Sequence, residues 1–209
     1  IIVNLMNKEK YDIPLCIKNR KVSGILLVGN IPDDYLEKIN EFNIPIVMVD
    51  CASNVINTDA VLSQNISGSY KAVRYLMKNG HKEIGFFGDI NSSLSFKERW
   101  LGYYECMSES KVYSDGTLSK ILDFSVINPM MENYILRNNF DEIKKILSKI
   151  KKMPSAWMCC NDMHAICLKN ALESMGYRIP EDISIIGFDD IDLCTMVTPA
   201  LTTIYVNKE

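Results

Sequence analysis

Polar side chains follow most of the apolar runs that are candidate strands in this chain. In a parallel sheet the carboxyl ends of the strands share one edge, so these side chains are expected to converge there. Arg99 lies in the early turns of the helix expected after the run at 84–88. Carboxylates accept hydroxyl protons and a guanidinium donates in a fixed fork, so together they suit a polyol. The strand-end residues are Asn30, Asp50, Asn65, Asp89, Asn161 and Asp189.

Each of these residues also has a simpler interpretation. Asp and Asn at strand-to-helix turns are commonly N-caps, and an arginine on a helix is by default solvated. We expect Asp162 and Asp190, which directly follow two of the strand ends, to act as caps. For Asn161 and Asp189, capping and ligand contact remain open as alternatives.

The sequence contains no set of residues with catalytic spacing. It lacks the G-x-S-x-G, P-loop and H-E-x-x-H motifs, and Gly85 and Gly88 do not make a dinucleotide fingerprint. Neither of the two histidines, His81 and His164, stands in a recognisable motif with a nucleophile. We therefore predict a protein that is not an enzyme and that has no catalytic residues, no metal site and no cofactor.

The composition is that of a globular protein without a surface for nucleic acid. The 209 residues are 47% hydrophobic and 23% charged, with a formal net charge of −3 and a pI near 5.5. No apolar run approaches membrane-spanning length, so no membrane partner is expected. The seven cysteines form no C-x-x-C pair, which favours a reducing cytoplasm. The chain begins inside an apparent strand without an initiator methionine, so we expect a fragment truncated at both ends.

Apolar runs and amphipathic stretches alternate along the chain, which indicates an α/β fold. Continuous apolar runs are typical of parallel strands that helices cover on both faces. Strands are expected at residues 1–6, 25–28, 46–50, 60–62, 84–88, 117–124, 156–160, 183–188 and 201–206. Helices are expected at residues 11–19, 33–42, 67–79, around 96–104, at 128–152 with a break near 138–139, and at 163–176.

Seven stretches, in order, resemble motifs of the effector-binding domain of the LacI/GalR (lactose-repressor) family of bacterial transcription regulators. Each is weak alone, but together they cover nearly the whole chain. One departure is Gln64-Asn65, where the family usually has Asp-Asn, so a polar contact there is expected to differ. The stretches are VSGILL at 22–27, IPIVMVD at 44–50, GSYKAVRYL through GHKEIG at 68–85, RWLGY at 99–103, NDM at 161–163, ISIIGFDD at 183–190 and PALTTI at 199–204.

The resemblance implies two Rossmann-like lobes with parallel sheets covered by helices, of the periplasmic-binding-protein-like type I. Residues 1–90 together with 199–209 would form an incomplete N-terminal lobe, and residues 91–198 would form the C-terminal lobe. A DNA-binding helix-turn-helix is implied upstream of this sequence.

The resemblance also implies an effector site in the cleft between the lobes. A small sugar-like molecule is the expected effector, and its binding would control whether the full-length regulator binds operator DNA. The alternative is a periplasmic sugar-binding protein of a transport system, which shares the fold; the free cysteines and the PALTTI stretch favour the regulator. The implied effector contacts are Arg99, Asn161 and Asp189, with Ser93 and Ser95 as further candidates.

Two more assignments follow from the resemblance. Phe124 stands where the family often places an aromatic ring that stacks on a sugar or a base, and core packing is its alternative. If Phe124 stacks, a nucleobase becomes an alternative effector. The segment 191–196 lies where the family builds part of its dimer interface, so we expect a homodimer with Leu193, Cys194 and Met196 in contact.

Overall fold

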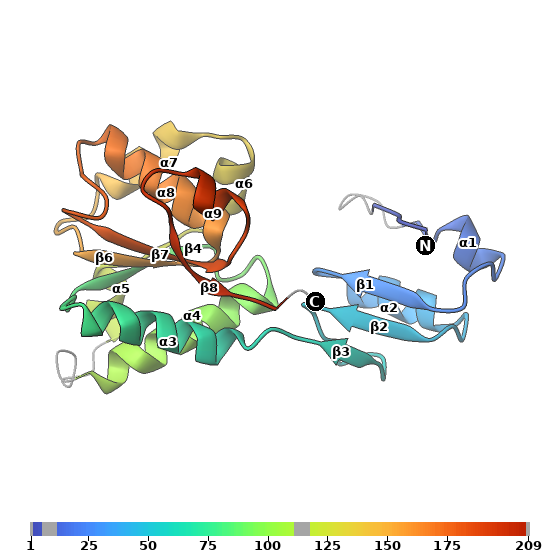
Figure 1. The fold of residues 1–209 in the computed structure, drawn as a ribbon. Coiled ribbons are helices and arrows are strands. Elements are labelled where there is room, and N and C mark those ends of the chain that lie inside the picture. Colours follow the sequence, from blue (N-terminus) through green and yellow to red (C-terminus); the bar gives the residue numbers. More distant parts are fainter. Residues whose placement is uncertain (1, 6–11, 111–117, 208–209) are drawn as a thin grey trace. The chain divides into compact units, whose positions relative to one another are not determined.

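The computed structural model describes residues 2–5, 12–110 and 118–207. The chain divides into two compact units, with the boundary between Ser63 and Gln64 (Figure 1). We call the part up to Ser63 unit 1 and the part from Gln64 unit 2. No helix in the described ranges is long and apolar enough to cross a membrane.

Unit 1 is built on a three-stranded parallel sheet (Figure 1). The strands are paired in sequence order: β1 (Ile25–Val28), β2 (Ile46–Val49) and β3 (Asp59–Val61). The helices of this unit are α1 (Leu15–Lys18) and α2 (Asp33–Asn40).

Helix α2 is held on this sheet by its apolar face. Tyr35, Leu36 and Ile39 recur at helical spacing and are each at most 2% exposed. They belong to one core cluster with Leu27 of β1 and Met48 of β2. Removing this much apolar surface from water is the main stabilising contribution within unit 1.

Unit 2 is a five-stranded parallel sheet with helices on both faces (Figure 1). The strands lie in the order β5 (Val126–Ile127), β4 (Ile84–Gly88), β6 (Ala156–Cys159), β7 (Ser184–Asp189) and β8 (Thr202–Tyr205). The helices are α3 (Asn65–Lys78), α4 (Leu94–Glu109), α5 (Leu118–Asp123), α6 (Met131–Leu136), α7 (Phe140–Leu147), α8 (Asp162–Ser174) and α9 (Leu193–Met196).

Successive residues of the central strands face opposite sides of this sheet, and each side has its own core. Phe86 of β4 and Met158 of β6 pack in a cluster with side chains of α3 and α4. Phe87 and Trp157 pack in a second cluster with side chains of α6, α7 and α8. The sheet is therefore covered on both faces, as the continuous apolar runs predicted.

The order of the strands reverses between β4 and β6. After β4 the chain passes through α4 and α5 to β5 on one side, and it then returns through α6 and α7 to β6 on the other side. In open α/β sheets, ligands bind outside the carboxyl ends of the strands at such a switch point. The adjoining carboxyl ends of β4 and β6 are therefore the expected position of a ligand site in unit 2.

The predicted lobe boundaries at residues 90 and 199 are wrong. Strand β4 hydrogen-bonds to β6, and β8 hydrogen-bonds to β7, so both strands belong to the sheet of unit 2. Helix α3 belongs there as well, because it packs along α4. The sequence order of the elements does not reveal which sheet a strand joins, since strand pairing is a long-range property.

Two predicted strands are also wrong within the described residues. Residues 2–5 form no strand. Residues 118–123 form helix α5, because Ile121 is buried in the core beside α4 and the Ser125 hydroxyl donates back to the Ile121 carbonyl at 2.9 Å. The predicted break near 138–139 is confirmed, since it separates α6 from α7.

Candidate functional site

Helix α4 carries the central cationic residue of the candidate site. Its first turn is capped by Ser93, whose hydroxyl oxygen accepts a hydrogen bond from the backbone N–H of Phe96 at 3.2 Å. Arg99 and Gly102 are three residues apart and therefore lie on the same face of the helix. A Cβ atom at Gly102 would lie 2.1 Å from the carbonyl oxygen of Ile66 in α3. Glycine at this position thus allows α4 to approach the backbone of α3.

The close approach of the two helices brings Arg99 to a set of acceptors from several elements. Its Nε donates to Asn65 Oδ1 of α3 at 2.9 Å, and its Nη1 donates to the Cys160 carbonyl at 2.7 Å. Its Nη2 donates to Asp189 Oδ1 at the end of β7 at 2.8 Å. Ser69 of α3 donates its hydroxyl to the carbonyl of Arg99 at 2.5 Å. Arg99 therefore ties α3, α4, β6 and β7 together at one edge of the sheet.

The guanidinium of Arg99 is buried in this arrangement. Its side chain is 5% exposed, whereas the side chain of Asp189 is 30% exposed. The guanidinium carbon lies 3.8 Å from the centre of the Phe188 ring, within the range of a cation–π contact. The interpretation of Arg99 as a solvated helix residue is wrong, because burial and three charge-assisted hydrogen bonds fix its geometry.

Asp189 has an unusual backbone conformation. Its φ angle is 108°, in a region that a non-glycine residue rarely adopts. Such strain persists only where the surrounding structure imposes it, and it clusters at functional sites. The ion pair with Arg99 and the pairing of β7 with β8 hold Asp189 in this conformation.

Asn161 caps helix α8. Its Oδ1 accepts from the backbone N–H of His164 at 2.9 Å and lies 2.8 Å from Nδ1 of the same histidine. The capping alternative for Asn161 is thus confirmed. Because Oδ1 faces the helix, the amide nitrogen is the part of this side chain that can serve a ligand.

His164 is a deeply buried titratable group at this edge of the sheet. It is 1% exposed, and its ring meets Phe96 edge-on with centroids 5.3 Å apart. Burial, and next the positive charge of Arg99, lower the pKa of His164 to about 3. The imidazole is therefore neutral near pH 7.

The prediction that Asp162 caps a helix is wrong. Its Oδ1 accepts from the Thr203 hydroxyl at 2.5 Å, and its Oδ2 accepts from the Ile191 N–H at 3.0 Å. The carboxylate, 1% exposed, thereby joins the start of α8 to β8. Asp190 is not a helix cap either, because Asp192 occupies the N-cap position of α9.

The remaining predicted contacts lie at different places. Ser93 is used as the cap of α4, and Ser95 is half-buried in its first turn. The side chain of Phe124 packs against the core beside α3 and α4, as its core alternative predicted. Its carbonyl oxygen lies against Gly85, three residues before the end of β4, so its backbone is not at the carboxyl edge.

Asn65 and its neighbour Glu98 complete the polar network around Arg99. The amide nitrogen of Asn65 donates to Glu98 Oε2 at 2.8 Å, while its oxygen serves Arg99. Asn65 was expected to follow a strand, but it is the first residue of α3 and is 3% exposed. In the sequence, the signal for this position is that Gln64-Asn65 stands where the LacI/GalR family usually has Asp-Asn.

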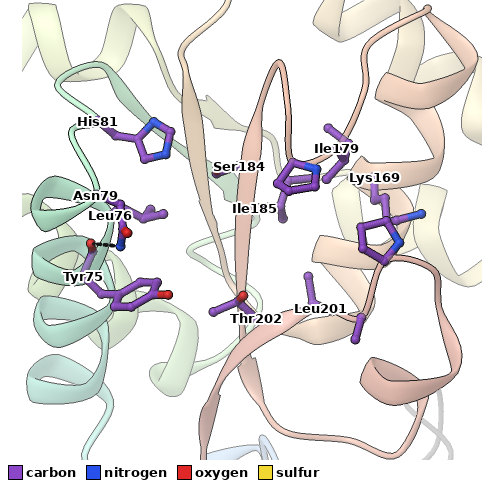
Figure 2. A pocket seen from close by; sticks show the side chains of 13 residues that line it. Tyr75, Leu76, Asn79, His81, Lys169, Ile179, Ser184, Ile185, Leu201 and Thr202 are labelled. Carbon is purple, nitrogen blue, oxygen red and sulfur yellow. Dashed lines mark hydrogen bonds between the residues drawn. The ribbon is translucent and has the colours of Figure 1, made fainter.

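A pocket of about 500 Å³ lies at the opposite edge of the same sheet (Figure 2). It is bounded by the last turns of α3 and by the first residues of β7 and β8, including Tyr75, Asn79, Ser184 and Thr202. In Figure 2 the amide of Asn79 donates to the Tyr75 carbonyl, at 2.8 Å. None of the described residues around Arg99 lines this pocket, so the two features are separate.

Within the described ranges, no three His, Cys, Asp or Glu side chains are grouped so that they could hold a metal ion. All seven cysteines are free thiols. The polar groups at the carboxyl edge are the guanidinium of Arg99, the amide of Asn161, the carboxylate of Asp189 and the neutral imidazole of His164. The chemistry of this set suits hydrogen bonding to a small polar molecule.

Comparison with known proteins identifies the type of domain. Residues 73–209 match the family model described as a periplasmic binding protein-like domain. The transcriptional repressor PurR of Haemophilus influenzae is 32% identical over 216 residues, an alignment that covers 99% of this chain and 59% of that protein. PurR of Pasteurella multocida is also 32% identical, with 98% of this chain and 58% of that protein covered.

Solved structures show the same fold. A transcription regulator from Lactobacillus plantarum superposes with a TM-score of 0.74 at 23% identity, over 91% of this chain and 68% of that chain. A LacI family transcriptional regulator from Enterococcus faecium, with bound ribose, superposes with a TM-score of 0.71 at 24% identity, over 90% of this chain and 66% of that chain. The present chain spans less than two thirds of the length of the PurR proteins it matches.

Proposed function

The chain belongs to the periplasmic binding protein-like family, as a domain of the LacI/GalR type, and we propose that it senses a small-molecule effector for a transcription regulator. The relatives at 32% identity are named transcriptional repressors. Their role is regulatory rather than catalytic, and the site residues fit binding without any catalytic step.

The observation that carries the proposal is the preformed pair of Arg99 and Asp189. The arginine is held by Asn65 and the Cys160 carbonyl, so it positions the carboxylate before any ligand arrives. Asp189 keeps 30% of its side chain exposed and can accept hydrogen bonds from a ligand. Preorganisation of this kind reduces the entropy lost on binding.

A polyhydroxy molecule is the effector class that these groups favour. Asp189 accepts from hydroxyl groups, and the amide of Asn161 donates to hydroxyl oxygens. Two solved structures with this fold are described with bound ribose. A nucleobase is favoured by a stacking ring, and the predicted ring, Phe124, is partly buried and packs against the core beside α3 and α4. We therefore favour a sugar over a nucleobase.

We also propose the output of this sensor. The related repressors are described as HTH-type, which supports operator DNA as the partner of the full-length protein. Leu193 and Met196 are 44% and 71% exposed and are candidates for a homodimer contact, whereas Cys194 is 2% exposed and faces inward. Free thiols throughout favour the cytoplasm over the periplasm, and therefore the regulator over a periplasmic sugar-binding protein.

Isothermal titration calorimetry tests the proposed effector class directly. The protein is titrated with a panel of pentoses and hexoses that includes D-ribose, and with adenine and guanine. We expect a sugar to bind and Asp189→Asn to weaken that binding at least about tenfold, because a charge-assisted bond is lost. Asp182→Asn is the matched control, since Asp182 pairs with Arg178 on the surface. Binding of a base with no sugar response would overturn the polyol proposal.

A further inference from the structure

His164 lies at the switch point between β4 and β6, beside the Arg99 cluster. Its ring packs edge-on against Phe96 of α4 and Phe87 of β4. Gly88 has no side chain, so Cys160 and His164 can pack directly against its backbone. A Cβ atom on Gly88 would lie 2.1 Å from Cys160 Sγ and 3.3 Å from His164 Cδ2. The ring is therefore enclosed by apolar groups and by the ends of two strands.

The hydrogen bonds of Asn161 determine which ring nitrogen of His164 carries the proton. Asn161 Oδ1 accepts from the backbone N–H of His164, so the amide cannot be flipped without losing that bond. The same oxygen lies 2.8 Å from Nδ1, which must then be the protonated nitrogen and donate. Nε2 of His164 is consequently an acceptor with a free lone pair.

No described residue donates to this acceptor. Nε2 of His164 is fully buried and has no hydrogen-bond partner. Glu132 faces it, and the Oε1 atom of that carboxylate, 3.8 Å away, also accepts. A buried acceptor that faces another acceptor lacks a donor, and native proteins rarely leave such a group unsatisfied.

Protonation of His164 does not supply the missing donor at neutral pH. Arg99 lies close enough to disfavour a second positive charge, and burial disfavours it further. The missing donor must therefore come from a bound molecule, since no described residue supplies it.

We propose that Nε2 of His164 accepts a hydrogen bond from an effector hydroxyl, so that His164 selects polyols that carry a hydroxyl group at one defined carbon. The inference rests on the proposed effector function. The side chain of Glu132, whose Oε1 lies 3.8 Å from Nε2 of His164, is 32% exposed, so the group that faces the ring is itself reached by solvent. An ordered water molecule is the alternative occupant of the same position.

Sugars that lack one hydroxyl test this inference against the water alternative. D-ribose and its monodeoxy analogues are titrated by calorimetry into the wild-type protein and into His164→Leu and His164→Gln variants. Leucine removes the acceptor, whereas the Oε1 atom of glutamine can restore one near the position of Nε2. We expect one deoxy analogue to bind the wild-type protein at least about tenfold more weakly than ribose does. The His164→Leu variant should bind this analogue and ribose with equal affinity. The His164→Gln variant should again bind ribose more tightly than the analogue, though by a smaller factor than the wild-type protein does.

A second readout is the ¹⁵N chemical shift of Nε2 in the protein labelled at histidine. We expect an unprotonated Nε2 in the free protein and an upfield shift when ribose binds. If ribose binds but leaves the Nε2 shift of the wild-type protein unchanged, and the deoxy discrimination is the same in the wild-type and leucine proteins, water or no donor occupies the position and the inference is wrong. If no sugar in the panel binds the wild-type protein, the proposed function fails and the inference fails with it.

Discussion

Nη2 of Arg99 lies 2.8 Å from Oδ1 of Asp189, and the pair joins the middle of a helix to the end of a strand 90 positions away in the sequence. The arginine is buried and the aspartate is partly exposed. The buried partner therefore fixes the position of the exposed one. The contacts that stabilise unit 2 therefore also set the geometry of its candidate ligand site.

We expect Arg99→Lys to destabilise unit 2 by about 2–4 kcal/mol, because lysine cannot bond three fixed acceptors and leaves buried oxygens unsatisfied. Urea denaturation followed by tryptophan fluorescence measures the change, since Trp157 is in the core of this unit. Arg178→Lys is the control: Arg178 also makes a forked pair, with Asp182, but its side chain is 72% exposed. A loss no greater than that of the control would show that the buried fork does not stabilise the fold.

Gly102→Ala separates α3 from α4. The added methyl group would lie 2.1 Å from the Ile66 carbonyl oxygen, so the helices must shift and the bonds from Arg99 to α3 must lengthen. We expect the free energy of unfolding to fall by at least about 2 kcal/mol. Leu101→Ala is the control, because Leu101 precedes Gly102 and its side chain is 44% exposed. This change should lower the free energy of unfolding by less than about 1 kcal/mol. Equal losses in the two variants would contradict the close approach of the helices.

The local part of this site could be predicted from the sequence. The spacing of Arg99 and Gly102 places both on one helix face, and polar residues after apolar runs mark the carboxyl edge of a parallel sheet. This reasoning places Asn161 and Asp189 at that edge, where the structure has them. These features depend only on residues close together in the chain, which is why pattern reasoning reaches them.

The long-range part could not be predicted. The partner of Arg99 on α3 is Asn65, and this contact depends on how two helices pack across the sheet. The burial of His164 arises from Phe96 and Phe87, which precede it by more than sixty residues, so no local pattern reveals it. The lobe boundary failed for the same reason, because pairing of β4 with β6 and of β8 with β7 is set by tertiary structure.

The stability of unit 2 should fall as the pH is lowered below neutral, because of His164. The pKa of this residue is about 3 in the folded protein, against an ordinary value of 6.5 for histidine. Between these values the unfolded chain binds a proton that the folded protein does not, so unfolding is favoured as the pH falls. The loss attributable to His164 between pH 7 and pH 5 should be about 2 kcal/mol.

Urea titrations at pH 7, 6 and 5 measure this effect, with His164→Leu as the reference. The leucine variant keeps every other titrating group, including His81, so the difference between the two proteins isolates His164. We expect the wild-type protein to lose about 2 kcal/mol more than the variant over this range. Parallel curves for the two proteins would mean that His164 titrates normally and is not buried.

Thiol labelling tests the burial of the cysteines. Cys159 and Cys160 are fully buried, and burial raises the pKa of each thiol well above its usual range, so both stay protonated. Cys16 is half-buried and is the most accessible of the seven. In native protein at pH 7.5, iodoacetamide should modify Cys16 first and leave Cys159 and Cys160 unmodified, as mapped by mass spectrometry. In urea all seven should react; native labelling at Cys159 or Cys160 would refute their burial.

The proposed homodimer contact can be tested at α9. Leu193 and Met196 are exposed apolar residues on one short helix, and charges placed there should repel across a symmetric interface. We expect Leu193→Glu combined with Met196→Glu to convert a dimer into a monomer in sedimentation-velocity experiments. Leu136→Glu is the control. Leu136 is 72% exposed, about as much as Met196, but it lies at the end of α6 and not on α9. A double variant that sediments as the wild-type dimer does would place the interface on another surface.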